Sequence, residues 1–419
     1  MPGLFAQPRF HVVAIAMLLA SGCAFGPRAL ECSHRPYNEA VKQVTEEELL
    51  LNLVRLRYND DFIHLDMSSV AAQYELDVAA EARPFFGFAS SSGIGFFRSM
   101  VLPDVGVTTV NRPILTMVPL NDPATVRQLF QSGTSEDILL LAETSWPIAT
   151  ICRLYTESLN GVPNAPSASG PTRAFVPQFR EFQRVVWLLQ ILQDRAELSL
   201  VRAERLTEIG SPLPAAGVTA QSQVEAAKNG YEYRERPDKT WVLVKRDRQL
   251  ALVIKSEAVG SAEVQELCQL LNLRPGLLRY NVVVGRAEEA SSCAAPPLSD
   301  TIYLLPRSTV QAMFYLSHGV VVPPEHLACG LVRATVEPDG QVFDWQEVTQ
   351  GLFTVRSVKQ HCRPEHAHVA VQYHGWWFYI DDRDQDSKMT FTLMMPLTRV
   401  DLIGARKGAS PVLTLPVGK

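Results

Sequence analysis

Three aspartates at alternating positions, Asp382, Asp384 and Asp386, are the residues of this sequence best suited to chemistry, and they follow directly on an aromatic run. Carboxylate oxygens at this spacing begin calcium-binding loops and can converge on one cation. The loop is not an EF-hand, because Ser387 stands where the turn needs glycine and Leu393 where it needs a bidentate glutamate. Two interpretations stay open: a site for a divalent cation or another ligand, and a turn whose side chains cap the next segment.

A second candidate metal site lies just before this turn, at His361, Cys362, His366 and His368. On a strand, His366 and His368 would share a face about 7 Å apart, and two ligands at that spacing can bind one ion. No HExxH or CxxC pair accompanies them, so solvated histidines on a polar strand face are the simpler interpretation.

The first 22 residues have the pattern of a secretory signal peptide. They contain one cation, Arg9, no acid, and the apolar block Val12–Ala20, which is too short to cross a bilayer as a helix. The segment Leu19-Ala20-Ser21-Gly22-Cys23 resembles the lipobox of bacterial lipoproteins, in which the cysteine is acylated and becomes the new N-terminus. Ala20 stands where that family usually has leucine, and cleavage without lipidation is the alternative. The resemblance implies three acyl chains on Cys23, which anchor far more firmly than one.

Two further stretches, Asn52–Tyr58 and Trp377–Lys388, resemble an uncharacterised family of Gram-negative-type envelope lipoproteins, over most of the mature chain. That family implies a location and no activity. Because Ala24, and not aspartate, follows Cys23, the resemblance implies an outer-membrane lipoprotein whose body faces the periplasm or the cell surface.

Composition limits the partners. The 419 residues are 47% hydrophobic and 20% charged, which excludes a disordered chain. The net charge is −5, from 39 Lys and Arg against 44 Asp and Glu, so we expect no nucleic-acid partner. No GxSxG, Walker or GxGxxG motif occurs. We therefore expect a non-enzymatic binding or scaffolding lipoprotein, held to the membrane by lipid, with an envelope protein or glycan as partner. The alternative is a cation-dependent enzyme or carbohydrate-binding module that uses Asp382, Asp384 and Asp386.

Seven cysteines are present, and assigning Cys23 to lipid leaves six in a compartment where disulfides persist. Cys268, in a predicted helix, and Cys293, in a predicted loop, are the candidate disulfide. The alternative is that several cysteines are small buried apolar residues, because a chain of this length needs no cross-links.

Periodicity predicts the elements that must position these residues. Thr45 begins a predicted capping box, and an apolar stripe at 49–56 makes a helix there. The alternation of 63–67 and 70–78 predicts strands, with a bulge or turn at Ser68-Ser69 where the phase changes. Further helices are expected at 178–195, 219–229, 261–271 and 308–318, and further strands at 240–245, 249–255, 277–284, 301–305, 352–358 and 369–380.

Helices and strands are interspersed along the chain. This order predicts an α+β fold with mixed, largely antiparallel sheets, packed helices and no transmembrane span in the mature chain. After Asp386, a strand and a short helix ending before Pro396 are both compatible with the pattern. The predicted regions are a signal peptide at 1–22, a tether at 23–44, an N-terminal α+β region at 45–208 and a C-terminal α+β region at 218–415.

Overall fold

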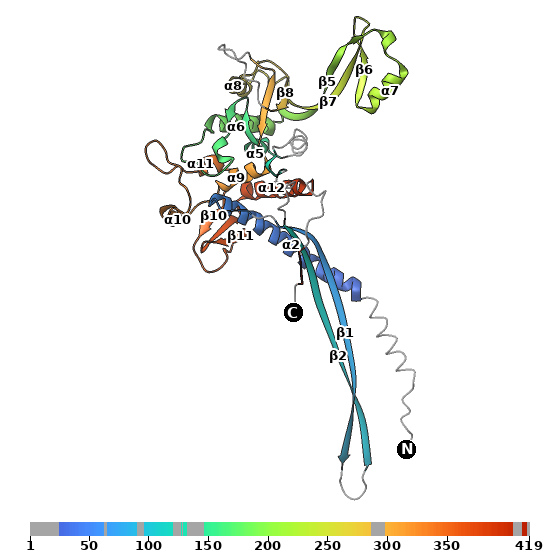
Figure 1. The fold of residues 1–419 in the computed structure, drawn as a ribbon. Helices are drawn as coiled ribbons and strands as arrows, with labels where there is room; N and C mark the ends of the chain where they lie inside the picture. The colour runs from blue at the N-terminus through green and yellow to red at the C-terminus, as the bar shows by residue number, and fades with distance from the viewer. Residues whose placement is uncertain are drawn as a thin grey trace. The chain divides into compact units, whose positions relative to one another are not determined.

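The computed structural model describes residues 25–62, 65–89, 96–119, 127, 129–131, 146–285, 298–404 and 413–416 (Figure 1). The expected signal peptide and Cys23 lie outside these ranges. Contacts divide the chain into a hairpin unit (residues 1–48, 63–122 and 407–419) and a globular unit (49–62 and 123–406). The predicted α+β class is confirmed, because helices combine with mixed, mostly antiparallel sheets. Within the described ranges, no helix has the length and apolar composition that crossing a bilayer requires.

Helix α2 (Phe25–Arg57) is far longer than the helix expected from residue 45. The predicted capping box at Thr45 is wrong, because its hydroxyl donates to the Val41 carbonyl one turn earlier, as threonine does inside a helix. The segment predicted as a tether is therefore helical from Phe25 onward. The apolar stripe is confirmed: Leu50, Leu53 and Val54 are fully buried in the globular unit.

Strands β1 (Leu65–Ala89) and β2 (Phe96–Pro119) form a long antiparallel hairpin, and β13 (Leu413–Pro416) pairs with the end of β2. At about 3.3 Å per residue, each long strand extends for about 80 Å. The register shifts between Met67 and Ser69, so the irregularity predicted at Ser68-Ser69 is confirmed as a bulge inside one continuous strand.

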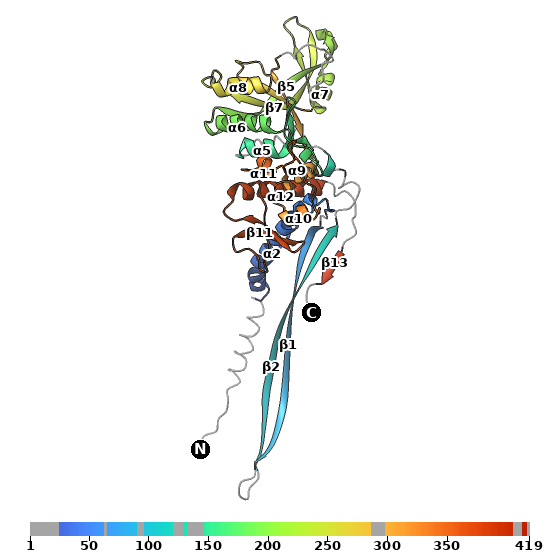
Figure 2. The same cartoon turned by 90° about the vertical axis from the view of Figure 1, so that its left-hand side faces the viewer.

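The first core of the globular unit lies between a seven-stranded sheet and three helices. The strand order is β4-β3-β9-β8-β7-β5, with β6 paired to β7, and only β8 and β9 run parallel within it. Figure 2 shows α5, α6 and α8 next to one another. The elements are α5 (Ile148–Tyr155), β3 (Thr156–Leu159), β4 (Val162–Pro163), η1 (Pro166–Ala168), α6 (Arg180–Asp194), β5 (Leu198–Leu213), β7 (Trp241–Ile254), α8 (Ala262–Leu270), β8 (Arg279–Val284) and β9 (Thr301–Pro306).

The predicted helices of this region are confirmed with small changes at their ends. Ser261 accepts the Val264 amide and begins α8, and α6 buries most of its circumference. Trp187 of α6 is the exception, because it is half exposed and the Arg184 guanidinium lies 4.3 Å from its ring centroid.

The C-terminal end of β5 and the N-terminal end of β7 form a lobe with η2 (Ala215–Gly217), α7 (Ala220–Lys228) and β6 (Tyr231–Glu235) (Figure 1). Strand β7 is continuous from Trp241 to Ile254, so the separation expected between two strands at 240–245 and 249–255 is wrong. The pairing of β5 with β7 over almost their whole length keeps the chain extended there. The predicted boundary between residues 208 and 218 falls inside this lobe.

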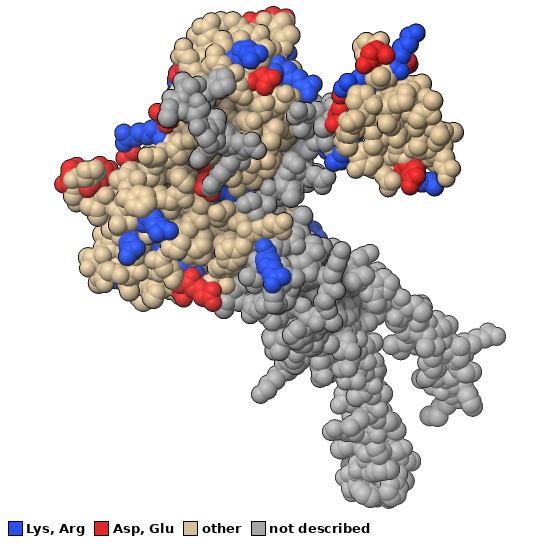
Figure 3. Space-filling model, turned by 45° about the horizontal axis from the view of Figure 1, so that its top comes forward, with Lys and Arg blue, Asp and Glu red and all other residues tan. Residues whose placement is uncertain are grey.

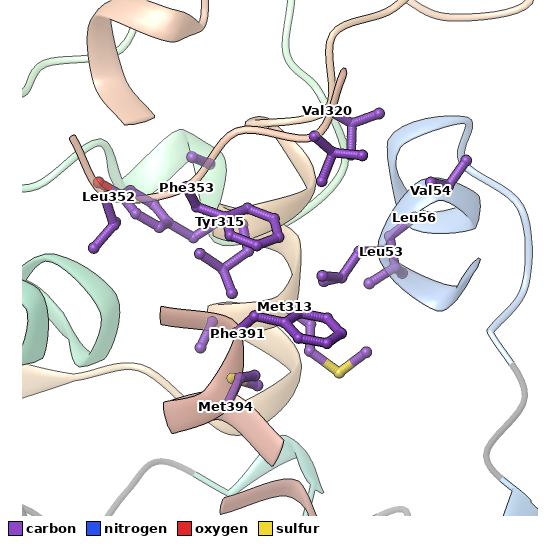
Figure 4. Close-up of a cluster of buried hydrophobic side chains, with 14 of the residues drawn as sticks. Leu53, Val54, Leu56, Met313, Tyr315, Val320, Leu352, Phe353, Phe391 and Met394 are labelled. Atoms are coloured by element: carbon purple, nitrogen blue, oxygen red, sulfur yellow. The ribbon is translucent and has the colours of Figure 1, made fainter. Parts of the chain in front are cut away.

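The second core joins the end of α2 to the C-terminal elements. Side chains from α2, α9 and α12 point toward one another in Figure 4, and the Phe353 and Phe391 rings stack with centroids 6.5 Å apart. Each large apolar side chain buried this way contributes about 1.5–3 kcal/mol. The elements are α9 (Thr309–Ser317), α10 (Pro324–Ala328), α11 (Gln346–Thr349), β10 (Arg356–Val358), β11 (Ala367–Tyr373), β12 (Trp376–Asp381) and α12 (Gln385–Gly404).

The strand predicted at 369–380 is two strands. His374 and Gly375 both have positive φ angles and form the turn between β11 and β12, which pair antiparallel in the sheet β10-β12-β11. Beyond Asp386 the chain is helical, and α12 continues past Pro396, where the predicted short helix was expected to have ended.

Two buried arginines hold the globular unit together from inside. Arg307 is 1% exposed, and its guanidinium lies 4.1 Å from the Tyr315 ring centroid. Burial lowers its pKa to about 10, so it remains charged at neutral pH. It donates hydrogen bonds to the Ser169 hydroxyl and to the carbonyls of Arg153, Thr156 and Asn164.

The second, Arg57, donates to the Thr172 hydroxyl at 2.6 Å, and that oxygen lies 3.4 Å from Nε2 of the buried His318. The His318 ring packs on Trp345 with centroids 4.0 Å apart, and its Nδ1 contacts the Phe314 carbonyl at 2.7 Å. Burial, and then the charge of Arg57, lower the pKa of His318 to about 3. This imidazole is therefore neutral at neutral pH.

Candidate functional site

The acidic turn joins β12 to α12 and brings the predicted aspartates to the start of a helix. Asp384 accepts the Ser387 amide at 3.1 Å, and the Ser387 hydroxyl donates to its other carboxylate oxygen at 2.7 Å. This is the geometry of a helix N-cap, because a carboxylate satisfies an amide of the first turn. Ser387 is buried and also accepts the Thr354 amide, so the cap is tied to the chain before β10.

Asp382 contacts a lysine and a histidine of the protein itself. Its carboxylate lies 2.7 Å from Lys388 Nζ and 3.7 Å from His368 Nδ1. The hydrogen bond from Lys388, and then its charge, lower the pKa of Asp382. Asp386 is exposed. Among the residues that the structure describes, no three His, Cys, Asp or Glu side chains are grouped so that they could hold a metal ion. The turn therefore has the geometry of a cap and an ion pair.

The histidine positions are dispersed. His361, Cys362 and His366 are exposed and precede β11, while His368 is half-buried within it. The register of β11 shifts between Ala367 and Val369, so the alternation that would place 366 and 368 on one face is interrupted there. Two of the four positions reach the aspartate turn: the His366 carbonyl accepts the Asp382 amide at 2.8 Å, and His368 Nδ1 lies 3.7 Å from the Asp382 carboxylate.

Of the two cysteines predicted as a disulfide, only Cys268 lies in the described part of the chain. Cys268 is a free buried thiol on α8, 3.3 Å from the Tyr280 hydroxyl, and Cys293 lies outside the described residues. Cys152 is also free and buried, and burial raises its pKa to about 12. Such a thiol stays protonated and is a poor nucleophile. Both cysteines fit the alternative that they are small buried apolar residues.

A cluster of aromatic rings that the sequence did not predict lies where the end of α2, α10 and the β11–β12 turn meet. Tyr58 and His326 are buried, and the Tyr58 hydroxyl lies 2.6 Å from His326 Nδ1. The His374 ring centroid lies 5.6 Å from that of Tyr58 and 6.2 Å from that of His326. Tyr373 and Trp376 complete the cluster. At its edge, the Tyr373 hydroxyl donates a hydrogen bond to the Asp60 carboxylate at 2.8 Å.

Electrostatics keep this cluster uncharged at its centre. Burial raises the pKa of Tyr58, and burial followed by the nearby His374 lowers the pKa of His326. Burial, and then the hydrogen bond to Asp60, raise the pKa of Tyr373 to about 12. Two neutral phenols and a neutral imidazole pack and hydrogen-bond, but they supply no activated nucleophile. The sequence signals were Tyr58 directly after the apolar stripe and the His374-Gly375 turn. Their contact with His326 depends on the tertiary fold.

Two hollows lined by described residues of the globular unit differ greatly in volume. A cavity of about 70 Å³ lies against α5 and the sheet, lined largely by apolar side chains that include Cys152, Leu189, Leu252 and Leu304. It is small beside ligand pockets of about 300–1,000 Å³. A groove of about 580 Å³ lies where the start of α6 meets the turn at 337–338; its lining includes Pro163, Pro177, Pro338, Arg180 and Glu337. The groove has the size of a binding site.

On the face drawn in Figure 3, Lys and Arg lie among Asp and Glu, and neither sign forms a single patch. Comparisons with protein-family models, curated proteins and solved structures found no match to this chain.

Proposed function

We propose that this chain is a lipid-anchored envelope protein that binds or scaffolds a partner and catalyses no reaction. The observation that carries the proposal is the lipobox-like segment Leu19–Cys23, which overlaps the C-terminal end of the apolar block Val12–Ala20. Acylation at Cys23 would anchor the mature chain to a membrane through its N-terminus. Ala24, in place of aspartate, favours the outer membrane, with the body facing the periplasm or the cell surface.

The geometry of the globular unit supports binding over catalysis. Two of its deeply buried ionisable groups, Arg307 and His318, are enclosed by packing and hydrogen bonds, and neither lines the cavity or the groove described above. The groove between the start of α6 and the 337–338 turn has the volume of a ligand-binding site, and we place the partner there. An envelope protein is the favoured partner and a glycan the alternative.

A cation-dependent enzyme or a carbohydrate-binding module at the acidic turn has less support. Asp382 already pairs with Lys388, and Asp384 already caps α12. A cation would have to displace these contacts.

Lipidation is tested with the full-length chain expressed in a Gram-negative host and labelled with radioactive palmitate. We expect label in the chain and in Cys32→Ser, a matched control nine residues away, and none in Cys23→Ser. The labelled forms should fractionate with outer membranes, and Cys23→Ser should not. Equal labelling and equal fractionation of the two variants would overturn the proposal. Cross-linking of the native envelope, followed by mass spectrometry, would then identify the partner.

A further inference from the structure

The hairpin of β1 and β2 has two chemically different faces. Because successive residues of a strand lie on opposite faces, the printed register assigns every position to one face. All charged residues of both strands fall on the same face, which we call the charged face. They are Asp66, Glu75, Asp77, Glu81 and Arg83 of β1 and Arg98, Asp104 and Arg112 of β2.

The opposite face, which we call the uncharged face, contains no charged residue from Leu65 to Phe88 or from Phe97 to Pro119. The bulge at Met67/Ser69 is needed for this separation, because without it Asp66 would fall on the uncharged face. Most positions of this face are aliphatic, aromatic or proline. Its polar positions are Tyr74, Ser99, Thr109 and Asn111.

A face of this composition and length needs a cover. A two-stranded hairpin alone is marginally stable in water, and a sheet gains independent stability when an apolar face is packed. The hairpin extends for about 80 Å, and its two strands span about 10 Å across, so the uncharged face covers about 800 Å². Two such faces together supply about 1,600 Å², which is the typical area of a specific protein interface.

We propose that two copies of this chain pack the uncharged faces of their hairpins against each other. Facing sheets pack about 10 Å apart, and the paired hairpins would leave both charged faces in water. Because the uncharged face has no charge anywhere along its length, a two-fold arrangement buries no unpaired charge. A second copy supplies a face of matching length and composition. The inference goes beyond the proposed function and does not require lipidation.

A cysteine scan of the full-length chain tests the arrangement. Two copies with different affinity tags are co-expressed, each with one added cysteine, and treated with a bis-maleimide short enough to bridge sheets about 10 Å apart. Cross-linked product that carries both tags is quantified against the unsubstituted chain. We expect several-fold more product from Leu76→Cys, Val78→Cys and Ala80→Cys than from Asp77→Cys, Ala79→Cys and Glu81→Cys.

A matched pair of lysine variants tests the energetic basis. Val78 pairs with Val107 on the uncharged face, and its neighbour Ala79 pairs with Gly106 on the charged face. Val78→Lys would bury an unpaired charge, so we expect at least tenfold less two-tag complex, whereas Ala79→Lys should leave its amount unchanged.

Three results would overturn the proposal. The first is equal cross-linking from the two faces, which would indicate pairing at strand edges. The second is the absence of product carrying both tags, which would exclude a second copy as the cover. The third is a chain that stays single while vesicles of phosphatidylethanolamine and phosphatidylglycerol protect only the uncharged-face thiols from maleimide, which would identify lipid as the cover. The cysteine scan decides these cases even if Val78→Lys fails to fold.

Discussion

Replacing Arg307 by methionine should cost the globular unit about 3–5 kcal/mol of unfolding free energy, the range for large single-residue effects. Methionine keeps part of the buried volume but removes every donor of the guanidinium. The carbonyls of Arg153 and Thr156 would each keep the hydrogen bond that Asn164 Nδ2 donates. The Asn164 carbonyl would lose the bond that Arg307 donates to it.

The magnitude follows from these contacts. Leaving a buried carbonyl unsatisfied costs about 1–3 kcal/mol. The lost bond to the Ser169 hydroxyl adds about 0.5–1.5 kcal/mol, and the bonds from a charged donor to Arg153 and Thr156 contribute more than neutral ones. Losing the contact with the Tyr315 ring adds about 1 kcal/mol. Removing a buried charge offsets part of the sum, which leaves about 3–5 kcal/mol.

Urea unfolding of the purified chain, followed by tryptophan fluorescence and far-ultraviolet circular dichroism, measures this loss. The matched control is Arg180→Met, because that side chain is 79% exposed and its ion pair with Glu347 contributes little. We expect the control to change the unfolding free energy by less than about 0.5 kcal/mol. A loss below about 1 kcal/mol for Arg307→Met would refute the reasoning, because it would mean that the enclosed guanidinium is not needed to satisfy the carbonyls around it.

Two further predictions concern pH and cations. His318 has a pKa of about 3 in the folded chain, lowered mainly by burial, against about 6.5 when unfolded. The unfolded state therefore binds a proton that the folded state does not, so the unfolding free energy should fall as pH drops from about 6.5 toward 3, by up to about 1.4 kcal/mol per pH unit from this group. His318→Gln should flatten that dependence in urea titrations at several pH values, and an unchanged slope would contradict the assignment. Millimolar calcium should leave Tm unchanged, since Asp382 and Asp384 already have partners within the protein. A rise in Tm that Asp382→Asn abolishes would instead favour a cation site.

Local signals predicted the elements well where one short segment contains all the information. Thr219 and Ser308 each begin a helix with a capping box, in which the side chain and the residue three positions on exchange hydrogen bonds. The phase change at Ser68-Ser69 predicted the bulge in β1 for the same reason, since alternation is a property of the strand itself. At Thr45 the local signal failed, because the helix already continued through the preceding residues.

The candidate site was harder to predict, because its geometry depends on which segments meet. The spacing of Asp382, Asp384 and Asp386 is compatible with a cation loop and with a helix cap, and the orientation of Ser387 and Lys388 distinguishes the two geometries. The hydrogen bond between Tyr58 and His326 joins residues 268 positions apart, and no local pattern indicates such a contact.

The sequence by itself determined the α+β class, the starts of α7, α8 and α9 and the apolar stripe of α2, because these depend on propensities and periods within a few residues. It also contains the lipobox-like segment on which the proposed location depends. Only the tertiary structure decided that Arg307 and His318 are enclosed and that the acidic turn caps α12. Likewise, the strand register alone placed every charge of the hairpin on one face. The enclosure of Arg307 and His318 and the register of the hairpin depend on contacts between distant segments, and the free energy of burial and pairing that selects them has no local signature in the chain. The contacts of the acidic turn are local, but its spacing was compatible with two geometries, and the structure selected the cap.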